Sequence, residues 1–223
     1  MSDTQANILQ IIADRSQELS LASRTAAELV RYVNLALQQI PLDHDFEETR
    51  TSTDLSFTRS STLSYASVSK PADFWAPIEL NNADNDYKFW YCRPDLLKNL
   101  DRGDRYVPHD IEDAFAKDGS NLLIYHDKTE TLTLKYYSFY LVNDVSAGTT
   151  RVDFAAADTT DTFVLRNDDI LITRTLMYLM EKEPNSDNQY AKLAAYYENL
   201  IKAEKLHYPS QRLEAVEEQI FIG

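Results

Sequence analysis

The side chains best suited to chemistry in this chain are four histidines and a single cysteine. The histidines are His44, His109, His126 and His207, and none stands at the spacing of a known metal-binding motif. His126 is expected at a turn and His207 at a helix end, so we interpret both as surface or capping residues. Cys92 follows an aromatic run with no histidine near it in the sequence, so we expect a buried thiol without catalytic activity. A single cysteine also excludes an intrachain disulfide.

Two short acidic motifs carry oxygen ligands that a divalent cation could use. Asp43-His44-Asp45 lacks an ordered set of such ligands, and Asp84-Asn85-Asp86 lacks the glycine and the distal glutamate of a calcium loop. The chain has only four glycines and no nucleophile elbow, P-loop or dinucleotide fingerprint, which argues strongly against a glycine-rich phosphate cradle. We therefore expect no metal site, no cofactor and no enzymatic activity.

The charge balance limits the kinds of partner that the chain can bind. The 223 residues include 22 Lys and Arg against 36 Asp and Glu, for a formal net charge of -14. An acidic chain of this kind is poorly suited to track nucleic-acid phosphates or to bind an anionic membrane. It suits basic protein partners, or a surface that DNA passes without sticking. The sequence shows neither a signal peptide nor an apolar run of about 20 residues, so we expect a soluble protein with no membrane partner.

Hydrophobic periodicity predicts helices at both ends of the chain. Apolar residues recur at helical spacing in 4–17, and Thr25-Ala26-Ala27-Glu28 has the form of a capping box that opens a second helix. We expect Pro41 to end this second helix. The segments 167–183 and 189–205 are predicted to form a helical hairpin, because a proline and polar residues separate two amphipathic runs.

The middle of the chain alternates polar and apolar residues, which predicts strands. The expected strands are 63–68, 74–80, 87–92, 122–126 and 131–141. We expect 74–80 at a sheet edge, because Pro77 has no amide hydrogen to donate. The last two strands are predicted to pair as a hairpin around Asp127-Lys128-Thr129. Residues 42–60 and 143–162 are interpreted as loops, and 110–116 as a short helix.

Aromatic residues are dense in several of these elements. Each group is expected to form core, unless one of its faces packs against another subunit. The subunit-interface candidates are Tyr136, Tyr137, Phe139, Tyr140, Tyr190 and Tyr197. The rings around Trp75 and Trp90 also leave open a carbohydrate- or surface-binding module, which would need exposed and coplanar rings.

The predicted fold class is therefore α+β, a small helical bundle from the N- and C-terminal helices with a β-rich insertion between them. We assign residues 1–45 and 163–208 to the helical bundle and 46–162 to the β-rich domain. Residues 209–223 form an acidic stretch that ends in an apolar cluster. This stretch is either a frayed terminus or an arm that docks on a neighbouring protein.

This architecture resembles the head–tail adaptor, or connector, proteins of tailed bacteriophages. The segments that carry the resemblance are Thr133-Leu134-Lys135-Tyr136-Tyr137, Phe163-Val164-Leu165 with Asp169-Ile170-Leu171-Ile172, and Tyr190-Ala191-Lys192-Leu193-Ala194-Ala195-Tyr196-Tyr197. The resemblance implies a structural virion protein in the neck, assembled in the host cytoplasm, which forms a homo-oligomeric, dodecameric ring. It also implies that this ring lies between the portal protein and a downstream neck or tail protein, and that DNA passes through its lumen without specific binding.

The resemblance assigns the last segment of the chain to the portal. The residues of this portal-docking arm would be Leu213, Val216, Ile220, Phe221 and Ile222. Two alternatives stay open: another ring protein of the neck or tail tube, and the carbohydrate- or surface-binding module.

Overall fold

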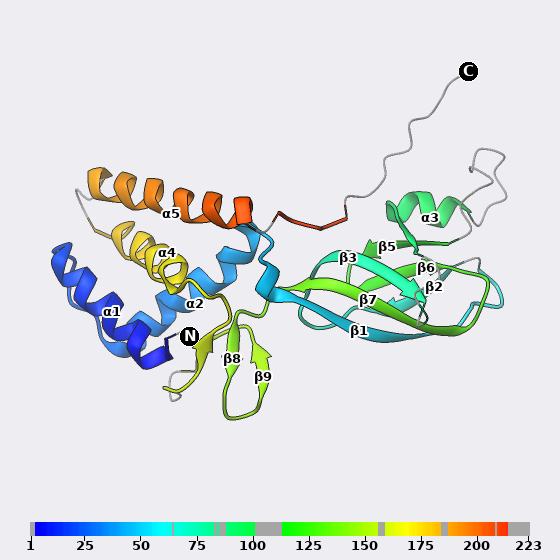
Figure 1. Cartoon of the computed structure of the whole chain (residues 1–223), viewed down its shortest axis with the longest axis horizontal. Coiled ribbons are helices and arrows are strands. Elements are labelled where there is room, and N and C mark those ends of the chain that lie inside the picture. Colours follow the sequence, from blue (N-terminus) through cyan, green and yellow to red (C-terminus); the bar gives the residue numbers. More distant parts are fainter. Residues whose placement is uncertain are drawn as a thin grey trace, which may run out of the picture. The chain divides into compact units, whose positions relative to one another are not determined.

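The structure is a computed structural model, and it describes residues 3–63, 65–82, 84, 88–100, 113–155, 159–183, 187–207 and 209–213. The chain is α+β, and its N- and C-terminal helices flank a β-rich central region (Figure 1). It divides into two compact units. The helical unit comprises residues 1–50 and 138–210, and the β unit comprises 51–137 and 211–223.

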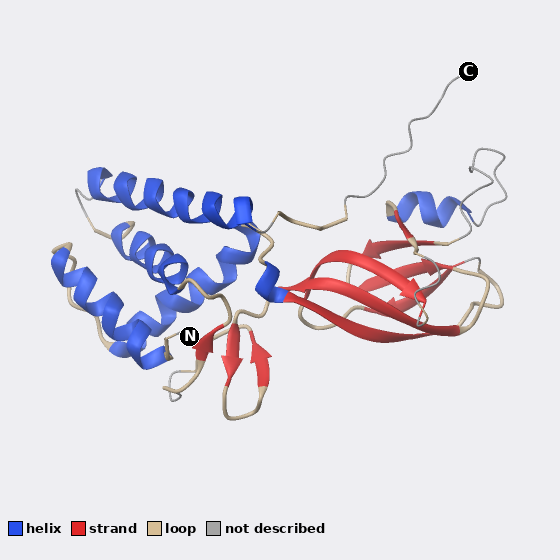
Figure 2. Ribbon diagram, in the orientation of Figure 1, coloured by secondary structure: helices blue, strands red, loops and turns tan. Residues whose placement is uncertain are grey.

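The helical unit is built from four helices and a small sheet (Figure 2). Its helices are α1 (Gln5–Glu18), α2 (Ala26–Asp43), α4 (Asp168–Met180) and α5 (Asp187–His207). The sheet has the order β10-β8-β9, from β8 (Val142–Asp144), β9 (Thr149–Arg151) and β10 (Thr162–Phe163).

Side-chain caps fix where three of these helices begin. The hydroxyl of Thr4 accepts a hydrogen bond from the α1 backbone, and Asn167 does the same for α4. At α2 the predicted capping box is confirmed: Thr25 accepts from the Glu28 amide, and Glu28 accepts from the Thr25 amide at 2.8 Å. The prediction that Pro41 ends α2 was wrong, because the helix continues to Asp43. Pro41 has no amide hydrogen, so it removes one backbone hydrogen bond of the helix. The loss is tolerated because Pro41 lies in the last turn of α2.

Helix α4 is the centre of the helical unit. Nine of its thirteen residues are buried. Its side chains share one hydrophobic core with those of α1, α2, α5 and the small sheet. The residues of this core include Ile12, Leu37, Leu171, Leu176 and Ile201. A helix with most of its residues in the core cannot be displaced without opening that core, so α4 is central to the packing of the other three helices.

The N-terminal end of α4 provides a test of pH dependence. Burial, followed by the nearby charges of Asp3 and Asp169, raises the pKa of Asp168 above its ordinary value. Ionising this carboxyl therefore costs more in the folded than in the unfolded chain. Protonated Asp168 therefore contributes to the free energy of unfolding in acid. This contribution is lost as the pH rises from about 3.9 through the raised pKa of the folded chain. We expect Asp168→Asn to unfold at higher urea concentration than the wild type at pH 7, with the difference vanishing below about pH 4. A variant that is less stable than the wild type at pH 7 would contradict this assignment.

The β unit consists of two sheets that share a core. One sheet has the order β1-β7-β3, and the other has the order β2-β6-β5-β4. Their bounds are β1 (Arg50–Phe57), β2 (Tyr65–Ser69), β3 (Phe74–Asn82), β4 (Trp90–Tyr91), β5 (Ala114–Asp118), β6 (Asn121–Tyr125) and β7 (Glu130–Ser138). The core between them includes Phe57, Phe74, Phe115, Ile124 and Leu134. Helix α3 (Pro94–Leu100) covers part of the four-stranded sheet, where Leu97 packs with Ala114. A short 3₁₀ turn, η1 (Glu47–Thr49), precedes β1.

The predicted hairpin between 122–126 and 131–141 was wrong, although both strands exist. β6 and β7 belong to different sheets, and β6 instead pairs antiparallel with β5. The turn that joins β5 to β6 contains Gly119 at φ +58°, a conformation that glycine adopts without strain. The Asp127-Lys128-Thr129 segment therefore carries the chain from one sheet to the other. The edge position predicted for 74–80 is confirmed, because β3 ends its sheet.

Other segments differ from the sequence predictions because their composition is polar. The helix predicted for 110–116 is wrong over its described part, where β5 begins at Ala114. The segment 42–60 contains β1, and 143–162 contains most of the small sheet. By packing, residues 138–162 belong to the helical unit, whereas the sequence analysis assigned them to the β-rich domain. Likewise, residues 211–213 pack with the β unit.

Cys92 is buried, as predicted, with 4% of its surface exposed. Its thiol lies 3.6 Å from the carbonyl oxygen of Phe115. Burial, and to a smaller extent the charge of Asp95, raises the pKa of this thiol to about 11.

We therefore expect Cys92 to resist modification in the folded protein. On the order of 0.1% of such a thiol is ionised at pH 8, and the reagent has no path to it. An aromatic disulfide reagent should label native protein at the rate of unfolding and label protein in urea within seconds. Labelling of the native protein as fast as that of the urea-treated protein would show that the thiol is accessible.

Candidate functional site

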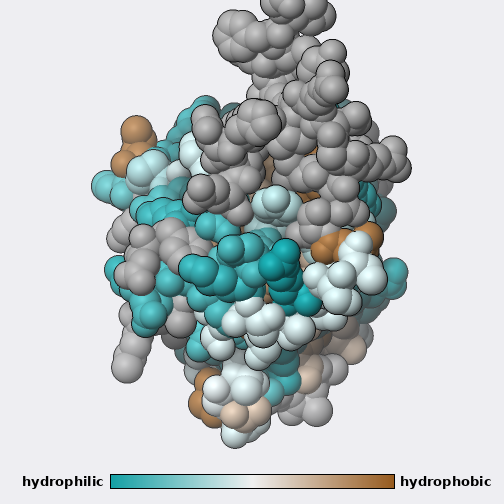
Figure 3. Space-filling model, turned by 90° about the vertical axis from the view of Figure 1, so that its right-hand side faces the viewer, coloured by the Kyte–Doolittle hydropathy of each residue, from teal (hydrophilic) through white to brown (hydrophobic). Residues whose placement is uncertain are grey.

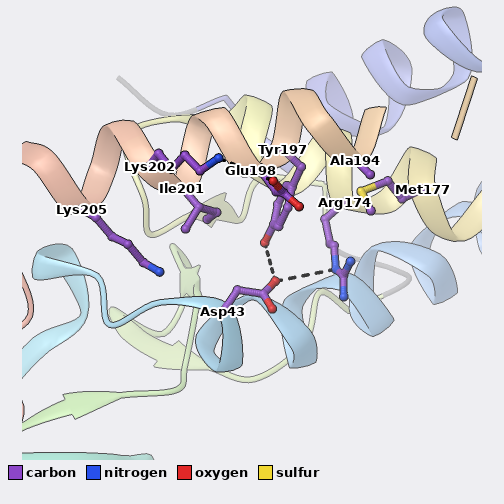
Figure 4. Close-up of a pocket in the computed structure, with 9 residues that line it drawn as sticks. All are labelled: Asp43, Arg174, Met177, Ala194, Tyr197, Glu198, Ile201, Lys202 and Lys205. Atoms are coloured by element: carbon purple, nitrogen blue, oxygen red, sulfur yellow. Dashed lines mark hydrogen bonds and ion pairs between the residues drawn. The ribbon is translucent and has the colours of Figure 1, made fainter. Parts of the chain in front are cut away.

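A groove in the helical unit is the site that the structure offers most clearly (Figure 4). It has a volume of about 340 Å³. Its walls come from the end of α2 and from α4 and α5. The lining residues are Asp43, Arg174, Met177, Ala194, Tyr197, Glu198, Ile201, Lys202 and Lys205. The groove therefore combines apolar side chains with three cations and two carboxylates.

Arg174 is the central cation of this groove. Its guanidinium carbon lies 5.2 Å from the ring centre of Tyr178 and 5.5 Å from that of Tyr197. Its Nε atom is 3.9 Å from Oδ2 of Asp43, an ion-pair distance that is too long for a hydrogen bond. This Nε is buried and has no hydrogen-bond partner among the described residues. Two tyrosine rings thus hold a guanidinium whose donors are largely unused.

Tyr197 and Asp43 form the polar end of the groove. The Tyr197 hydroxyl donates to Oδ2 of Asp43 at 2.7 Å, and Figure 4 shows both side chains converging on Arg174. Burial, together with this hydrogen bond to a carboxylate, raises the pKa of the Tyr197 hydroxyl far above its ordinary value. Tyr197 is therefore a fixed donor, and it holds one oxygen of Asp43 in place.

Two lysines stand at the exposed side of the groove. Lys202 pairs with Glu198 one helical turn away at 3.6 Å, and both side chains are more than two-thirds exposed. An exposed pair of this kind contributes little stability and is easily exchanged for another partner. Lys205 has no ion-pair partner among the described residues. Its side chain extends from α5 on the same side as that of Ile201 (Figure 4).

These groups could bind a ligand that carries a carboxylate. A carboxylate can accept two parallel hydrogen bonds from a guanidinium, and lysines beside it add charge. Met177, Ala194 and Ile201 offer apolar contact next to that charge. Across the described part of the chain, no group of three or more His, Cys, Asp or Glu side chains could hold a metal ion.

The aromatic residues predicted at a subunit interface fall into two groups, one buried within the chain and one half-buried. Tyr136, Tyr137 and Tyr197 are buried within the chain, at 4%, 1% and 6% exposure. Both faces of β7 find cover inside the β unit: the ring of Tyr136 packs beside Phe74, and that of Tyr137 packs with Ala76, Ile78 and Trp75. The remaining candidates, Phe139, Tyr140 and Tyr190, are half-buried.

The predicted portal-docking arm lies mostly outside the described residues. Val216, Ile220, Phe221 and Ile222 all fall there, and only Leu213 is described. The Leu213 amide donates to the carbonyl of Pro77 at 2.9 Å, and its side chain packs against the β-unit core. The start of the predicted arm is therefore attached to edge strand β3 of its own chain.

The two tryptophans of the carbohydrate-binding alternative lie in different sheets. Trp75 in β3 is half-buried, with the charged groups of Lys117 and Arg212 at 5.8 Å and 5.7 Å from its ring centre. Trp90 in β4 is 60% exposed. On the face shown in Figure 3, hydrophilic residues cover the centre of the described surface, and hydrophobic residues appear as separate small groups.

His126 was predicted at the surface, and this prediction was wrong. Only 3% of the residue is exposed, because the rings of Phe57 and Phe89 pack against it. Its Nδ1 contacts the carboxylate of Asp113, and its Nε2 contacts that of Glu130. The connection between β6 and β7 turns inward here, which the polar sequence did not indicate. His207, in contrast, is the last residue of α5 and is exposed, as predicted.

Sequence reasoning did not single out Arg174 or Lys205 as functional residues, and it considered Asp43 only as a possible cation ligand. The available signal was the stripe of α5, because its lining residues recur three and four positions apart. That spacing shows that the residues share a face, but not that α4 and α2 complete a groove beside it.

Neither the models of known protein families nor the sequences of curated proteins match this chain. In the described residues, no helix is long and apolar enough to cross a membrane.

Proposed function

We propose that this chain is a non-enzymatic head–tail adaptor of a tailed bacteriophage. It forms a homo-oligomeric ring in the neck of the virion, between the portal protein and a downstream neck or tail protein. The ring has twelve copies, the number that the resemblance implies, and it assembles in the host cytoplasm. DNA passes through its lumen without specific binding, since an acidic surface repels phosphates.

The main observation that supports this proposal is the division of the chain into two units. A helical unit made of both ends of the chain is interrupted by a β unit with its own core. The order of these parts is that of the adaptor architecture, and each unit offers its own contact surface. A ring subunit needs such separate surfaces, one for each neighbour along the ring and along the neck.

Surface residues of the helical unit support subunit contacts. Along the 21 residues of α5, only Tyr197 and Ile201 are buried. Tyr196 and Leu206 are 44% and 84% exposed on this helix, and Leu42 at the end of α2 is 55% exposed. Large exposed apolar side chains of this kind are suited to an interface with a polar rim.

A stop codon early in this reading frame of the source phage tests the proposal. We expect DNA-filled heads and separate tails to accumulate, because the two cannot join without the adaptor. A suppressor host that restores the protein should restore complete particles. Complete infectious particles made without the protein would refute an adaptor role, and tails of abnormal length would favour a tail-tube ring instead.

A further inference from the structure

The groove between α4 and α5 has more hydrogen-bond donors than its own residues can satisfy. Asp43 is held by Tyr197, and Glu198 is paired with Lys202. The Arg174 guanidinium makes no hydrogen bond with a described side chain, and its ion pair with Asp43 is long at 3.9 Å, although the side chain is only 18% exposed. A guanidinium placed between two tyrosine rings, with free donors and a lysine nearby, is an incomplete site for a carboxylate.

The apolar part of the groove restricts the ligand further. Met177 and Ile201 lie beside the charged groups, so a free small anion would leave their surface uncovered. A peptide that carries acidic residues next to large apolar ones would satisfy both parts. Its carboxylates would pair with Arg174 and Lys205, and its apolar side chains would be removed from water.

This chain contains such a peptide. Residues 214–223 read Glu-Ala-Val-Glu-Glu-Gln-Ile-Phe-Ile-Gly, in which acidic residues are followed, after Gln219, by three large apolar ones. They follow Leu213, which is anchored on β3, and ten residues can span at most about 35 Å. Their charge is opposite to that of the groove, in a chain that is otherwise strongly acidic.

We propose that the groove lined by Arg174, Met177, Ile201 and Lys205 binds residues 214–222 of a second copy of this chain. Glu217 and Glu218 pair with the cations, and Ile220 to Ile222 cover the apolar wall. The choice of a second copy rests on the proposed ring, because an arm that passes from each subunit to the next gives a heterologous contact of the kind that closes rings. The resemblance assigns the arm to the portal, so portal and groove would compete for it.

Self-association of the full chain, measured by sedimentation without portal, tests the inference. Two variants weaken the groove, Arg174→Gln with Lys205→Gln, and Lys202→Gln with Lys205→Gln. The second pair changes only exposed side chains, so it keeps the test valid if the first variant misfolds. A third variant, Glu217→Gln with Glu218→Gln, weakens the arm. We expect each to raise the dissociation constant about tenfold or more. Lys192→Gln, on the same helix but outside the groove, should leave it unchanged.

Mixing a groove variant with the arm variant shows whether the arm of one copy docks in the groove of another. A groove variant still has an intact arm, and the arm variant still has an intact groove. Their mixture should therefore recover dimers that neither forms alone. A mixture that stays monomeric would overturn docking between copies, as would a wild type that does not associate or variants that associate normally. The portal protein is absent from this experiment. A chain that does not self-associate through the groove would therefore not contradict the adaptor proposal, and a chain that does not bind the portal would not contradict docking between copies.

Discussion

Replacing His126 with alanine is expected to lower the free energy of unfolding by about 3 kcal/mol or more. The imidazole side chain is 1% exposed and lies between two carboxylates, those of Asp113 and Glu130. One ring nitrogen contacts each carboxylate, so this side chain joins the two acids in the interior of the β unit. Alanine would leave the two carboxylates, 20% and 26% exposed, without their contact to the imidazole.

The loss of packing adds to the loss of these polar contacts. The ring centres of Phe57 and Phe89 lie 5.8 Å and 5.1 Å from that of His126. Removing the imidazole would leave a cavity in the β unit that these rings cannot fill without moving. The site also connects three strands in two sheets, so we expect the change to weaken the link between the sheets.

Urea unfolding followed by tryptophan fluorescence measures this effect, since both tryptophans lie in the β unit. His126→Gln keeps a donor and part of the volume, and should lose less stability than His126→Ala. Asp127→Asn is the matched control, because that side chain is 74% exposed and should change stability little. A loss below about 1 kcal/mol for His126→Ala would show that the buried histidine is not a structural link.

Removing residues 214–223 is expected to abolish binding to the portal and to other copies while leaving the chain folded. The arm provides the acidic and apolar side chains of both proposed contacts. The described attachment of the C-terminal segment ends at Leu213, which the truncation keeps. The folded cores of both units lie in residues that the truncation does not touch.

Circular dichroism during heating tests whether the truncated chain is folded, and light scattering tests whether it binds. We expect the melting temperature to stay within a few degrees of the wild type, because the change removes no described core residue. Ile220→Asp with Phe221→Asp in the full chain should reproduce the loss of binding. Normal portal binding by the truncated chain would refute the docking arm.

The four helices of the helical unit could be predicted from the sequence because their signals are local. The Thr25 capping box and the apolar stripes of α2 and α5 depend on residues within four positions of each other. Which strands pair depends on residues far apart in the chain. Gly119 and Asp127-Lys128-Thr129 both resemble hairpin turns, and only the first joins two paired strands.

The candidate site was less accessible to sequence reasoning than the fold. Arg174 belongs to a helix whose other residues are mostly apolar, and its neighbours in the groove come from α2 and α5. His126 resembled a surface histidine because its sequence neighbours, Asp127 and Lys128, are polar. In both cases the environment is created by segments that meet only in the folded chain, so composition and periodicity could not reveal it.

The most direct test of the adaptor proposal is to mix the purified chain with the portal protein encoded by the same genome. The mass of the complex is then measured by light scattering. We predict a complex heavier than the portal by the mass of a full ring, about twelve chains of 25.6 kDa each. An unchanged mass, with the portal shown to be an intact ring, would contradict the proposal and would place the chain elsewhere in the neck or tail.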